Sequence, residues 1–356
     1  MAGVELGLIE GYYGKPWSWA ARRDVISKLS THGYGFHIYA PKADPFLRRR
    51  WQELHPAEAA DELAAFSAHC RGLGVRFGVG LSPYEIYRDF GTEAQAALAA
   101  KLQHLESLGL DDLAILFDDM RGDLPDLARN QSRIVHWIAE RTTATRLIVC
   151  PSYYTDDPIL DRVFGQRPEN YLEDLGAGLD PAIEVFWTGE EVCSREYSVG
   201  HLARVERKLR RKPFLWDNYP VNDGPLMSPF LHVRAFTGRP AEIGTRLSAH
   251  AVNPALQPML SQIPAITLAE SYLEGAAYEY GAAFARAAAE VLGEGLAAAL
   301  QLNLTQVQGF GLDRLTEENV RRMRARYEGF DHPGAREVLA WLDGAYRVTQ
   351  AEMDAS

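Results

Sequence analysis

Two adjacent aspartates, Asp118 and Asp119, follow an apolar run in the stretch LAILFDDM. The run at residues 113–117 has the length and composition of a short buried strand, so both carboxylates stand at a strand end, where water is partly excluded. Like charges repel there, and we expect one carboxyl to be ionised and the other protonated near neutral pH. General acid and base catalysis needs such a pair. Capping of the following helix and binding of a cation are the alternatives that this spacing leaves open.

Polar and aromatic residues also follow other apolar runs of the chain. They are Tyr13, Lys42, Tyr154, Trp187, Trp216, Asn218 and Asn253. Metal sites need converging carboxylates, histidines or cysteines, which these positions do not offer. Apolar ring faces beside lysine and amide donors suit a neutral, hydroxyl-rich ligand such as a sugar. The pattern therefore favours catalysis on a sugar over a metal site.

The elements that must position these residues alternate between short apolar runs and longer amphipathic stretches. We predict helices at 19–33, 57–74 and 93–109, each closing on a glycine that suits a helix C-terminus. This alternation predicts parallel strands joined by helices, and eight strands make a (β/α)8 TIM barrel with its chemistry at the C-terminal strand ends. The predicted strands are 5–9, 35–39, 75–81, 113–117, 146–150, 183–187, 214–216 and 248–252.

The pattern changes near Pro264 to alanine-rich helices, with Thr316 as a helix N-cap and Pro333 in a first helical turn. We therefore predict an α/β barrel domain at 1–263 and a helical C-terminal domain at 264–356 that carries no site residue. Apolar stripes on these helices serve as core or, as the alternative, as the surface of a homodimer.

Composition excludes several classes of function. The chain of 356 residues has a formal net charge of −11, which disfavours nucleic acid as a partner. Its three cysteines form no disulfide framework or zinc pattern, and no leader or membrane-spanning run is present, so we expect a cytoplasmic protein. Phosphate-binding loops, G-x-S-x-G elbows and H-E-x-x-H motifs are also missing from the sequence, and we expect no cofactor and no metal.

Six short motifs, in order along the chain, resemble those of glycoside hydrolase family 84, the family of O-GlcNAcases and bacterial β-N-acetylglucosaminidases. They are EGYYGKPW at 10–17, YAPK at 39–42, LFDD at 116–119, WTG at 187–189, WDN at 216–218 and NP at 253–254. The resemblance implies removal of terminal β-linked N-acetylglucosamine from a glycoconjugate, with retention of configuration. In substrate-assisted glycosidases of this kind the sugar's own acetamide is the nucleophile and an oxazoline is the intermediate.

The same resemblance implies roles for single residues. Asp118 would orient the acetamide N–H, and Asp119 would protonate the leaving oxygen and then activate water. Tyr154 would bond the acetamide oxygen, while Tyr13 and Trp216 would wall the acetyl pocket. Sugar hydroxyl or acetamide contacts would come from the backbone carbonyl of Gly11 and from Lys42, Asn218, Asp223 and Asn253.

The chain departs from the family pattern at the rim of the expected cleft. Ala43 stands where the family usually has an acidic residue after YAPK, and Tyr84 follows Ser-Pro where the family usually has glycine. Both positions bear on the leaving-group side, so protein-linked N-acetylglucosamine is one candidate substrate among several. The alternatives are a hydrolase for another 2-acetamido sugar polymer or fragment and a catalytically silent sugar-binding barrel.

Overall fold

The computed structural model describes residues 3–356 and confirms the predicted α/β fold. Eight parallel strands close into a barrel in sequence order, with β8 pairing back onto β1. Each predicted strand is present and agrees with the observed one within one residue at either end. The strands are β1 (Glu5–Ile9), β2 (Tyr34–Tyr39), β3 (Arg76–Leu81), β4 (Asp112–Leu116), β5 (Arg146–Cys150), β6 (Glu184–Trp187), β7 (Phe214–Asp217) and β8 (Ala249–Val252).

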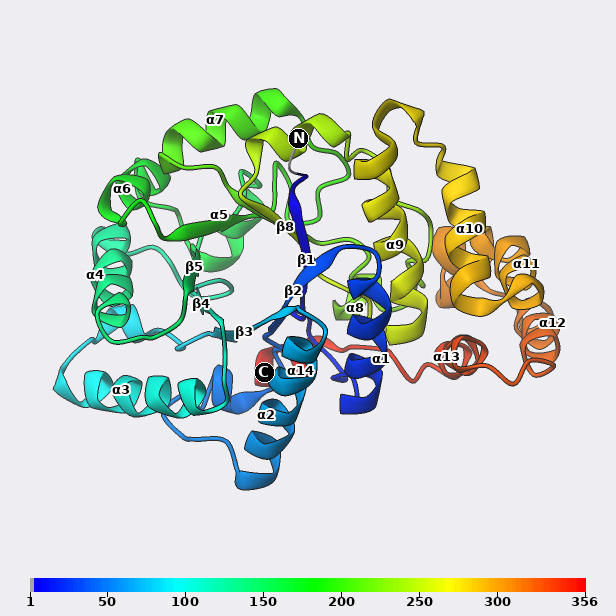
Figure 1. The fold of residues 1–356 in the computed structure, drawn as a ribbon, viewed down its shortest axis with the longest axis horizontal. Helices are drawn as coiled ribbons and strands as arrows, with labels where there is room; N and C mark the ends of the chain where they lie inside the picture. The colour runs from blue at the N-terminus through cyan, green and yellow to red at the C-terminus, as the bar shows by residue number, and fades with distance from the viewer. Residues whose placement is uncertain (1–2) are drawn as a thin grey trace.

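Helices surround the barrel, and a further group of helices lies to one side of it (Figure 1). The helices are α1 (Trp19–Ser30), α2 (Ala57–Gly72), α3 (Thr92–Ser107), α4 (Leu127–Ala139), α5 (Ile159–Phe164), α6 (Tyr171–Gly178), α7 (Val199–Leu209), α8 (Gly224–Met227), α9 (Pro258–Glu274), α10 (Tyr280–Leu292), α11 (Glu294–Leu302), α12 (Glu317–Tyr327), α13 (Pro333–Leu342) and α14 (Gln350–Ala355). Shorter helical turns are η1 (Pro45–Leu47), η2 (Ile86–Arg88), η3 (Ala241–Arg246), η4 (Gly275–Ala277), η5 (Thr305–Phe310) and η6 (Leu312–Arg314).

The glycines predicted to close the first three helices do so. Gly33, Gly74 and Gly109 all take positive φ just after α1, α2 and α3. A residue with a Cβ is strained in that conformation, so these glycines let the chain turn sharply from a helix into the next strand. The turns bring each strand back parallel to the one before it.

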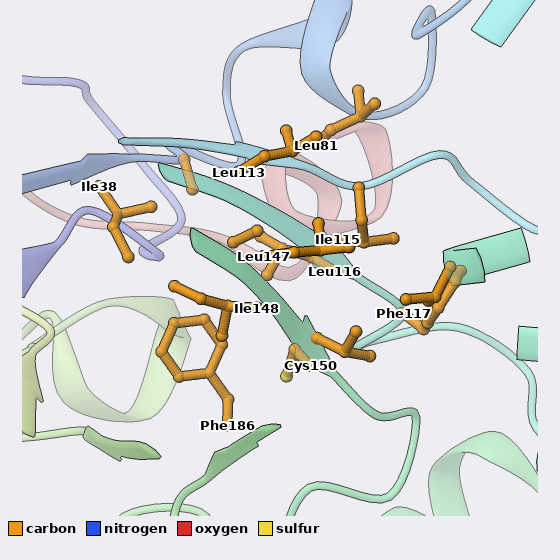
Figure 2. Packing of buried hydrophobic residues seen from close by; sticks show 14 of the residues in the cluster. Ile38, Leu81, Leu113, Ile115, Leu116, Phe117, Leu147, Ile148, Cys150 and Phe186 are labelled. Carbon is orange, nitrogen blue, oxygen red and sulfur yellow. The ribbon is translucent and has the colours of Figure 1, made fainter. Parts of the chain in front are cut away.

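The barrel core is built by strands that are buried on both faces, which is why they appear in the sequence as continuous apolar runs. All five residues of β4 are buried. Figure 2 shows Leu113 and Ile115 of β4 among the buried side chains, Ile148 of β5 beside Phe186, and Phe117 just beyond the end of β4. Packing of this kind fixes the end of β4, and with it the start of the loop that carries the two aspartates.

The C-terminal helices share their core with the barrel. One buried cluster includes Leu8 of β1, Ile263 of α9, Tyr327 of α12 and Trp341 of α13. Helix α9 packs on α1 as part of the ring around the barrel, and α10 and α13 pack on α9. Pro264, where we predicted the helical domain to begin, lies inside α9, so the predicted division falls within one continuous helix.

Capping residues in this region agree with the sequence prediction. The side chain of Thr316 accepts a hydrogen bond from the backbone N–H of Asn319 at the start of α12, and Pro333 occupies the first turn of α13. Over residues 3–356, no helix combines the length and hydropathy that crossing a bilayer requires.

Candidate active site

Asp118 and Asp119 reach the same cavity because β4 has ended before them. The strand stops at Leu116, and Asp119 adopts a left-handed backbone with φ of 54°. Alternation of side chains along a strand would have sent the two carboxylates to opposite faces. The break in the strand therefore explains how adjacent residues can serve one ligand.

Lys42 holds the first of the two carboxylates. It follows β2, and its Nζ donates to Asp118 Oδ2 and lies 3.7 Å from Asp119 Oδ2. Both Lys42 and Asp118 are buried, so their attraction is little screened by water. The other oxygen, Asp118 Oδ1, is also buried and has no hydrogen-bond partner among residues 3–356. Buried acceptors are normally paired, so this atom is left ready for a donor on a ligand.

Asp119 is surrounded by hydrogen-bond donors. The hydroxyls of Tyr13 and Tyr154 donate to its Oδ2 and Oδ1 at 2.9 and 3.0 Å, and Arg48 Nη2 donates to its backbone carbonyl at 3.1 Å. Burial opposes ionisation of this carboxyl, but the charges of Lys42 and Arg48 and the two tyrosine hydroxyls outweigh it and lower the pKa of Asp119. We had expected repulsion within the pair to decide its ionisation; instead the surrounding donors stabilise the charged form of Asp119.

The capping and cation alternatives do not fit this arrangement. Helix α4 begins at Leu127, with Asp126 at its N-cap, so neither carboxylate of the pair caps the helix that follows. The groups around the pair are a lysine, an arginine and two tyrosine hydroxyls. They already supply positive charge and donors, whereas a cation would require further acceptors.

A chain of hydrogen bonds joins the loops after β1, β7 and β8. The Trp216 indole and the Asn253 amide both donate to Asn218 Oδ1, at 3.0 and 2.9 Å, and Asn253 Oδ1 accepts from the backbone N–H of Gly11 at 3.2 Å. The Asn218 amide donates to the carbonyl of Val192 at 2.8 Å. Asn218 therefore fixes the positions of Trp216 and Asn253, in addition to the ligand contact that the resemblance implies.

Gly11 is required by the closeness of Trp216. A Cβ at position 11 would lie 2.0 Å from the Trp216 ring, so the backbone can pass the indole only without a side chain. The predicted role of Gly11 was a carbonyl contact with the sugar. The structure adds that it lets Trp216 form the wall of the cavity.

Asp223 enters the site from the loop after β7. Its Oδ2 accepts a hydrogen bond from the backbone N–H of Tyr13 at 2.8 Å. Burial raises the pKa of Asp223 to about 6, helped by the charge of Asp119 and opposed by the Tyr13 hydrogen bond and by Lys42. Its charge is therefore sensitive to pH in the range where many enzymes work.

The predicted site residues converge on one cavity of about 660 Å³, a volume typical of small-ligand sites. Lys42 lies beneath it, bonded to Asp118. The wall is formed by Gly11, Tyr13, Asp118, Asp119, Tyr154, Trp216, Asn218, Asp223 and Asn253. Trp187, which the sequence placed at the same rim, is instead buried, and its indole donates to His201 at 3.1 Å.

Comparison with protein families gives the site its context. The model of the β-N-acetylglucosaminidase family matches residues 6–304, which is most of the chain. The chain belongs to this family. The match confirms the resemblance to glycoside hydrolase family 84, and it spans the barrel and the first of the C-terminal helices.

Individual members of the β-N-acetylglucosaminidase family agree with that assignment. The protein O-GlcNAcases of mouse and rat are each 29% identical over 278 residues, which cover 75% of this chain and 30% of theirs. The chain thus matches less than a third of the length of these relatives. Among solved structures, a point mutant of the O-GlcNAc hydrolase of Thermobaculum terrenum is similar at 28% identity with a TM-score of 0.79, covering 95% of this chain and 80% of that one.

The cavity of this family member also has walls that the sequence did not predict. Arg48, Arg49 and Tyr84 form one side, and Gln350 and Met353 of α14 lie beside them. We had placed no site residue in the C-terminal helices, and this expectation was wrong for α14. The arginines stand in a run of three with no periodic pattern, and nothing in the sequence around α14 shows that it returns to the barrel.

Proposed function

We propose that this chain is a retaining exo-β-N-acetylglucosaminidase that works by substrate-assisted catalysis. The observation that supports this most directly is the unpaired, buried Asp118 Oδ1 beside a second carboxylate. An acetamide N–H would satisfy that acceptor, since a buried group without a partner costs free energy that a ligand can recover. A simple glucoside has no N–H to offer at that position.

In the first step, Asp118 would accept a hydrogen bond from the acetamide N–H. This bond would turn the acetamide oxygen toward the anomeric carbon. The ion pair with Lys42 holds Asp118 in place. The oxygen forms a bond to the anomeric carbon while the bond to the leaving oxygen breaks, and Asp119 gives that oxygen its proton. Because the nucleophile is tethered to the sugar, it can act with an effective molarity of about 10⁵ M or more, so orientation is the main task of the protein.

In the second step, the ionised Asp119 would take a proton from water as the water attacks the anomeric carbon of the protonated oxazoline, whose N–H still donates to Asp118. The acetamide leaves that carbon and is restored, and the proton on Asp119 is ready for the next cycle. Two inversions at one carbon give overall retention. The same residue thus acts first as acid and then as base, as microscopic reversibility requires.

Tyr154 connects sugar binding to the proton on Asp119. Its hydroxyl donates to Asp119 Oδ1 in this structure, which favours the charged carboxylate. If the hydroxyl turns to the acetamide oxygen when a sugar binds, as the family resemblance implies, Asp119 loses one donor and its pKa rises. Binding of the substrate would then load the acid with the proton that the first step consumes.

The substrate class that we propose is a glycoconjugate with a terminal β-linked N-acetylglucosamine, including protein serine or threonine that carries this sugar. The names of the mouse and rat relatives support the protein-linked form. Hydrolysis of another 2-acetamido sugar, or sugar binding without catalysis, remains an outcome of the test below.

The test compares an aryl N-acetyl-β-glucosaminide with the matching aryl β-glucoside. We expect turnover of the first alone, because only it carries the nucleophile. Equal turnover of both would refute acetamide participation and point to a nucleophile from the protein. Turnover of neither would favour another 2-acetamido sugar or a silent barrel, which binding of N-acetylglucosamine without hydrolysis would identify.

We also propose a homodimer formed through the C-terminal helices. Leu273 of α9 and Leu302 of α11 expose 88% and 71% of their surface, and a partner that covered them would remove this apolar surface from water. Light scattering of the purified chain, whose monomer mass is 39.7 kDa, is expected to give twice that value. A monomer at micromolar concentration would refute the dimer.

We propose a cytoplasmic location for the protein. All three cysteines are free, and Cys70 and Cys150 are buried among apolar side chains, as suits a reducing compartment. Fractionation of the source cells should recover the protein with cytoplasmic markers, and recovery outside the cytoplasmic membrane would refute this.

A further inference from the structure

Helix α14 returns from the helical side of the molecule to the mouth of the barrel. Figure 1 shows the red C-terminal segment running from α13 back to the barrel. Val348 anchors this segment: it is buried, its side chain packs beside Gly14, and its N–H donates to Ser228 Oγ at 3.1 Å. Thr349 then starts α14 with a capping box to Glu352.

Beyond Val348, α14 joins the start of α8 to the loop after β2, and both of these segments line the active-site cavity. Met353 packs beside Gly224, the first residue of α8. At the other end, Arg49 donates to main-chain oxygens of Asp354 and of Ser356, the residue after α14, at 3.2 and 2.8 Å, and Arg48 donates to the Ser356 oxygen at 3.3 Å. The helix therefore borders the cavity, supported by the start of α8 and by the loop after β2.

Arg48 shows which side of the cavity is covered. The guanidinium that reaches Ser356 also donates to the backbone carbonyl of Asp119 at 3.1 Å and to Ser82 Oγ at 3.2 Å. Asp119 is the residue that would protonate the leaving oxygen. Since α14 is held by the arginine that contacts Asp119, it covers the side on which the leaving group, or aglycone, departs.

The same side carries a departure from the family motif. Tyr84 stands after Ser-Pro where the family usually has glycine, and its ring lies under the guanidinium of Arg49 at 3.8 Å and close to that of Arg48 at 5.3 Å. Stacking of this kind holds a guanidinium in place. Tyr84 therefore supports the arginines that bind α14.

The attachment of α14 is weak compared with that of the segment before it. All six residues of α14 are described, and none of them is buried, whereas Val348 is 4% exposed. What holds the helix is one partly buried methionine and hydrogen bonds from arginines, of which Arg49 is exposed. Elements with few buried apolar contacts open most readily, so α14 can leave the cavity while Val348 stays in place.

We propose that α14 sets the aglycone specificity of the enzyme. It leaves room for a small leaving group, whereas a polypeptide that carries the sugar must displace it. Arg48 and Arg49, which donate to main-chain oxygens of Asp354 and Ser356 in this structure, would then donate to backbone carbonyls of the substrate. This inference rests on the proposed hydrolysis of N-acetylglucosaminides.

The direct test is hydrogen exchange of the α14 amides in the Asp119→Asn variant of the full chain, which binds substrate but lacks the acid. The two ligands are a peptide with β-linked N-acetylglucosamine on serine and the methyl β-glycoside of N-acetylglucosamine. We expect faster exchange in α14 with the glycopeptide and no change with the methyl glycoside, while the amides of α12 stay constant in both. Exchange in α14 that is unchanged or slower with bound glycopeptide would refute the displacement.

Kinetics of Met353→Ala give a second test that leaves both arginines intact. Loosening α14 raises the fraction of open enzyme, and because apparent affinity scales with that fraction, the ratio of kcat/KM for the glycopeptide to kcat/KM for an aryl glycoside should rise about tenfold. Ala351→Ser, on the exposed side of α14, should leave this ratio unchanged. An unchanged ratio in Met353→Ala, or a glycopeptide that neither form cleaves, would refute the proposal.

The outcome for the aryl glycoside separates this inference from the proposed function. If the unaltered chain does not cleave the aryl N-acetyl-β-glucosaminide, the proposed function has failed. If it cleaves the aryl substrate and α14 does not respond to a glycopeptide, only the role of α14 has failed.

Discussion

Replacement of Asp119 by asparagine is expected to separate acid catalysis from every other contribution of the site. Asparagine has nearly the same shape and tolerates the left-handed backbone that Asp119 adopts. Tyr154 can still donate to the side-chain oxygen at position 119, and the Tyr13 hydroxyl can accept from the new amide. Lys42 keeps its bond to Asp118. The variant should therefore bind the sugar as before and lose the proton donor.

The size of the loss depends on the leaving group. A nitrophenolate departs without a proton, so the aryl substrate should lose less than about tenfold in kcat/KM, since little acid assistance is needed. The alkoxide of serine is a poor leaving group and needs its proton. Its glycoside should lose about 10²- to 10⁴-fold, equivalent to about 2.7 to 5.4 kcal/mol of transition-state stabilisation.

The assay is kcat/KM for both substrates, with Asp123→Asn as the matched control. Asp123 lies in the same loop as Asp119 but pairs with Arg121 on the surface. kcat/KM is the right quantity because it reports steps only up to the first irreversible one, so the loss of the base in the second step does not confuse the comparison. Equal losses on the two substrates in Asp119→Asn, or a similar selectivity in Asp123→Asn, would refute the assignment of the acid.

Three further outcomes follow from the site. Asp118→Asn should lower kcat/KM even for a nitrophenyl substrate, because the acetamide loses the acceptor that orients it; unchanged rates would limit Asp118 to a structural role. The pKa of Asp223 is raised to about 6, and protonation of this carboxylate removes a charged acceptor from the site. The value of kcat/KM should therefore fall as the pH drops below about 6. This fall at acidic pH should be absent in Asp223→Asn. Lys42→Met leaves a buried carboxylate unpaired and should cost about 3–5 kcal/mol in the free energy of unfolding, measured by denaturant titration; a variant as stable as the unaltered chain would contradict this.

The barrel could be predicted closely from the sequence because local signals and the global fold agree. Strands buried on both faces must be apolar throughout, which makes them visible as runs, and β4 is an example. The glycines after α1, α2 and α3 mark where each helix ends. Neither signal depends on contacts between distant parts of the chain.

The ten predicted site residues lie together for a related reason. Parallel strands bring their C-terminal ends to one face of the barrel, so any residue that follows a strand is a candidate. Trp187 shows the limit of that rule, since it is the last residue of β6 and its side chain packs into the interior beside His201. Trp216 lies inside β7 and does line the cavity, so for a residue within a strand the direction of its side chain decides.

Arg48 and α14 could not be predicted, because their place in the site depends on long-range packing. Arg48 is separated by 308 residues from Ser356, whose carbonyl it binds. The path of the segment between α13 and α14 is set by Val348, which finds its place beside Gly14 of the first motif. Contacts of this kind have no local pattern in the sequence.

Asp119 is predictable from the sequence in one respect and not in another. Its position after a buried strand is visible in the sequence, but its left-handed backbone is not, and a non-glycine residue keeps that conformation only where its surroundings hold it. Arg48 holds its carbonyl, and Tyr13 and Tyr154 hold its carboxylate. These are also the groups that, with Lys42, lower its pKa. The contacts that place the acid therefore also keep it charged, and a ligand that draws Tyr154 away would both free the side chain and raise its pKa.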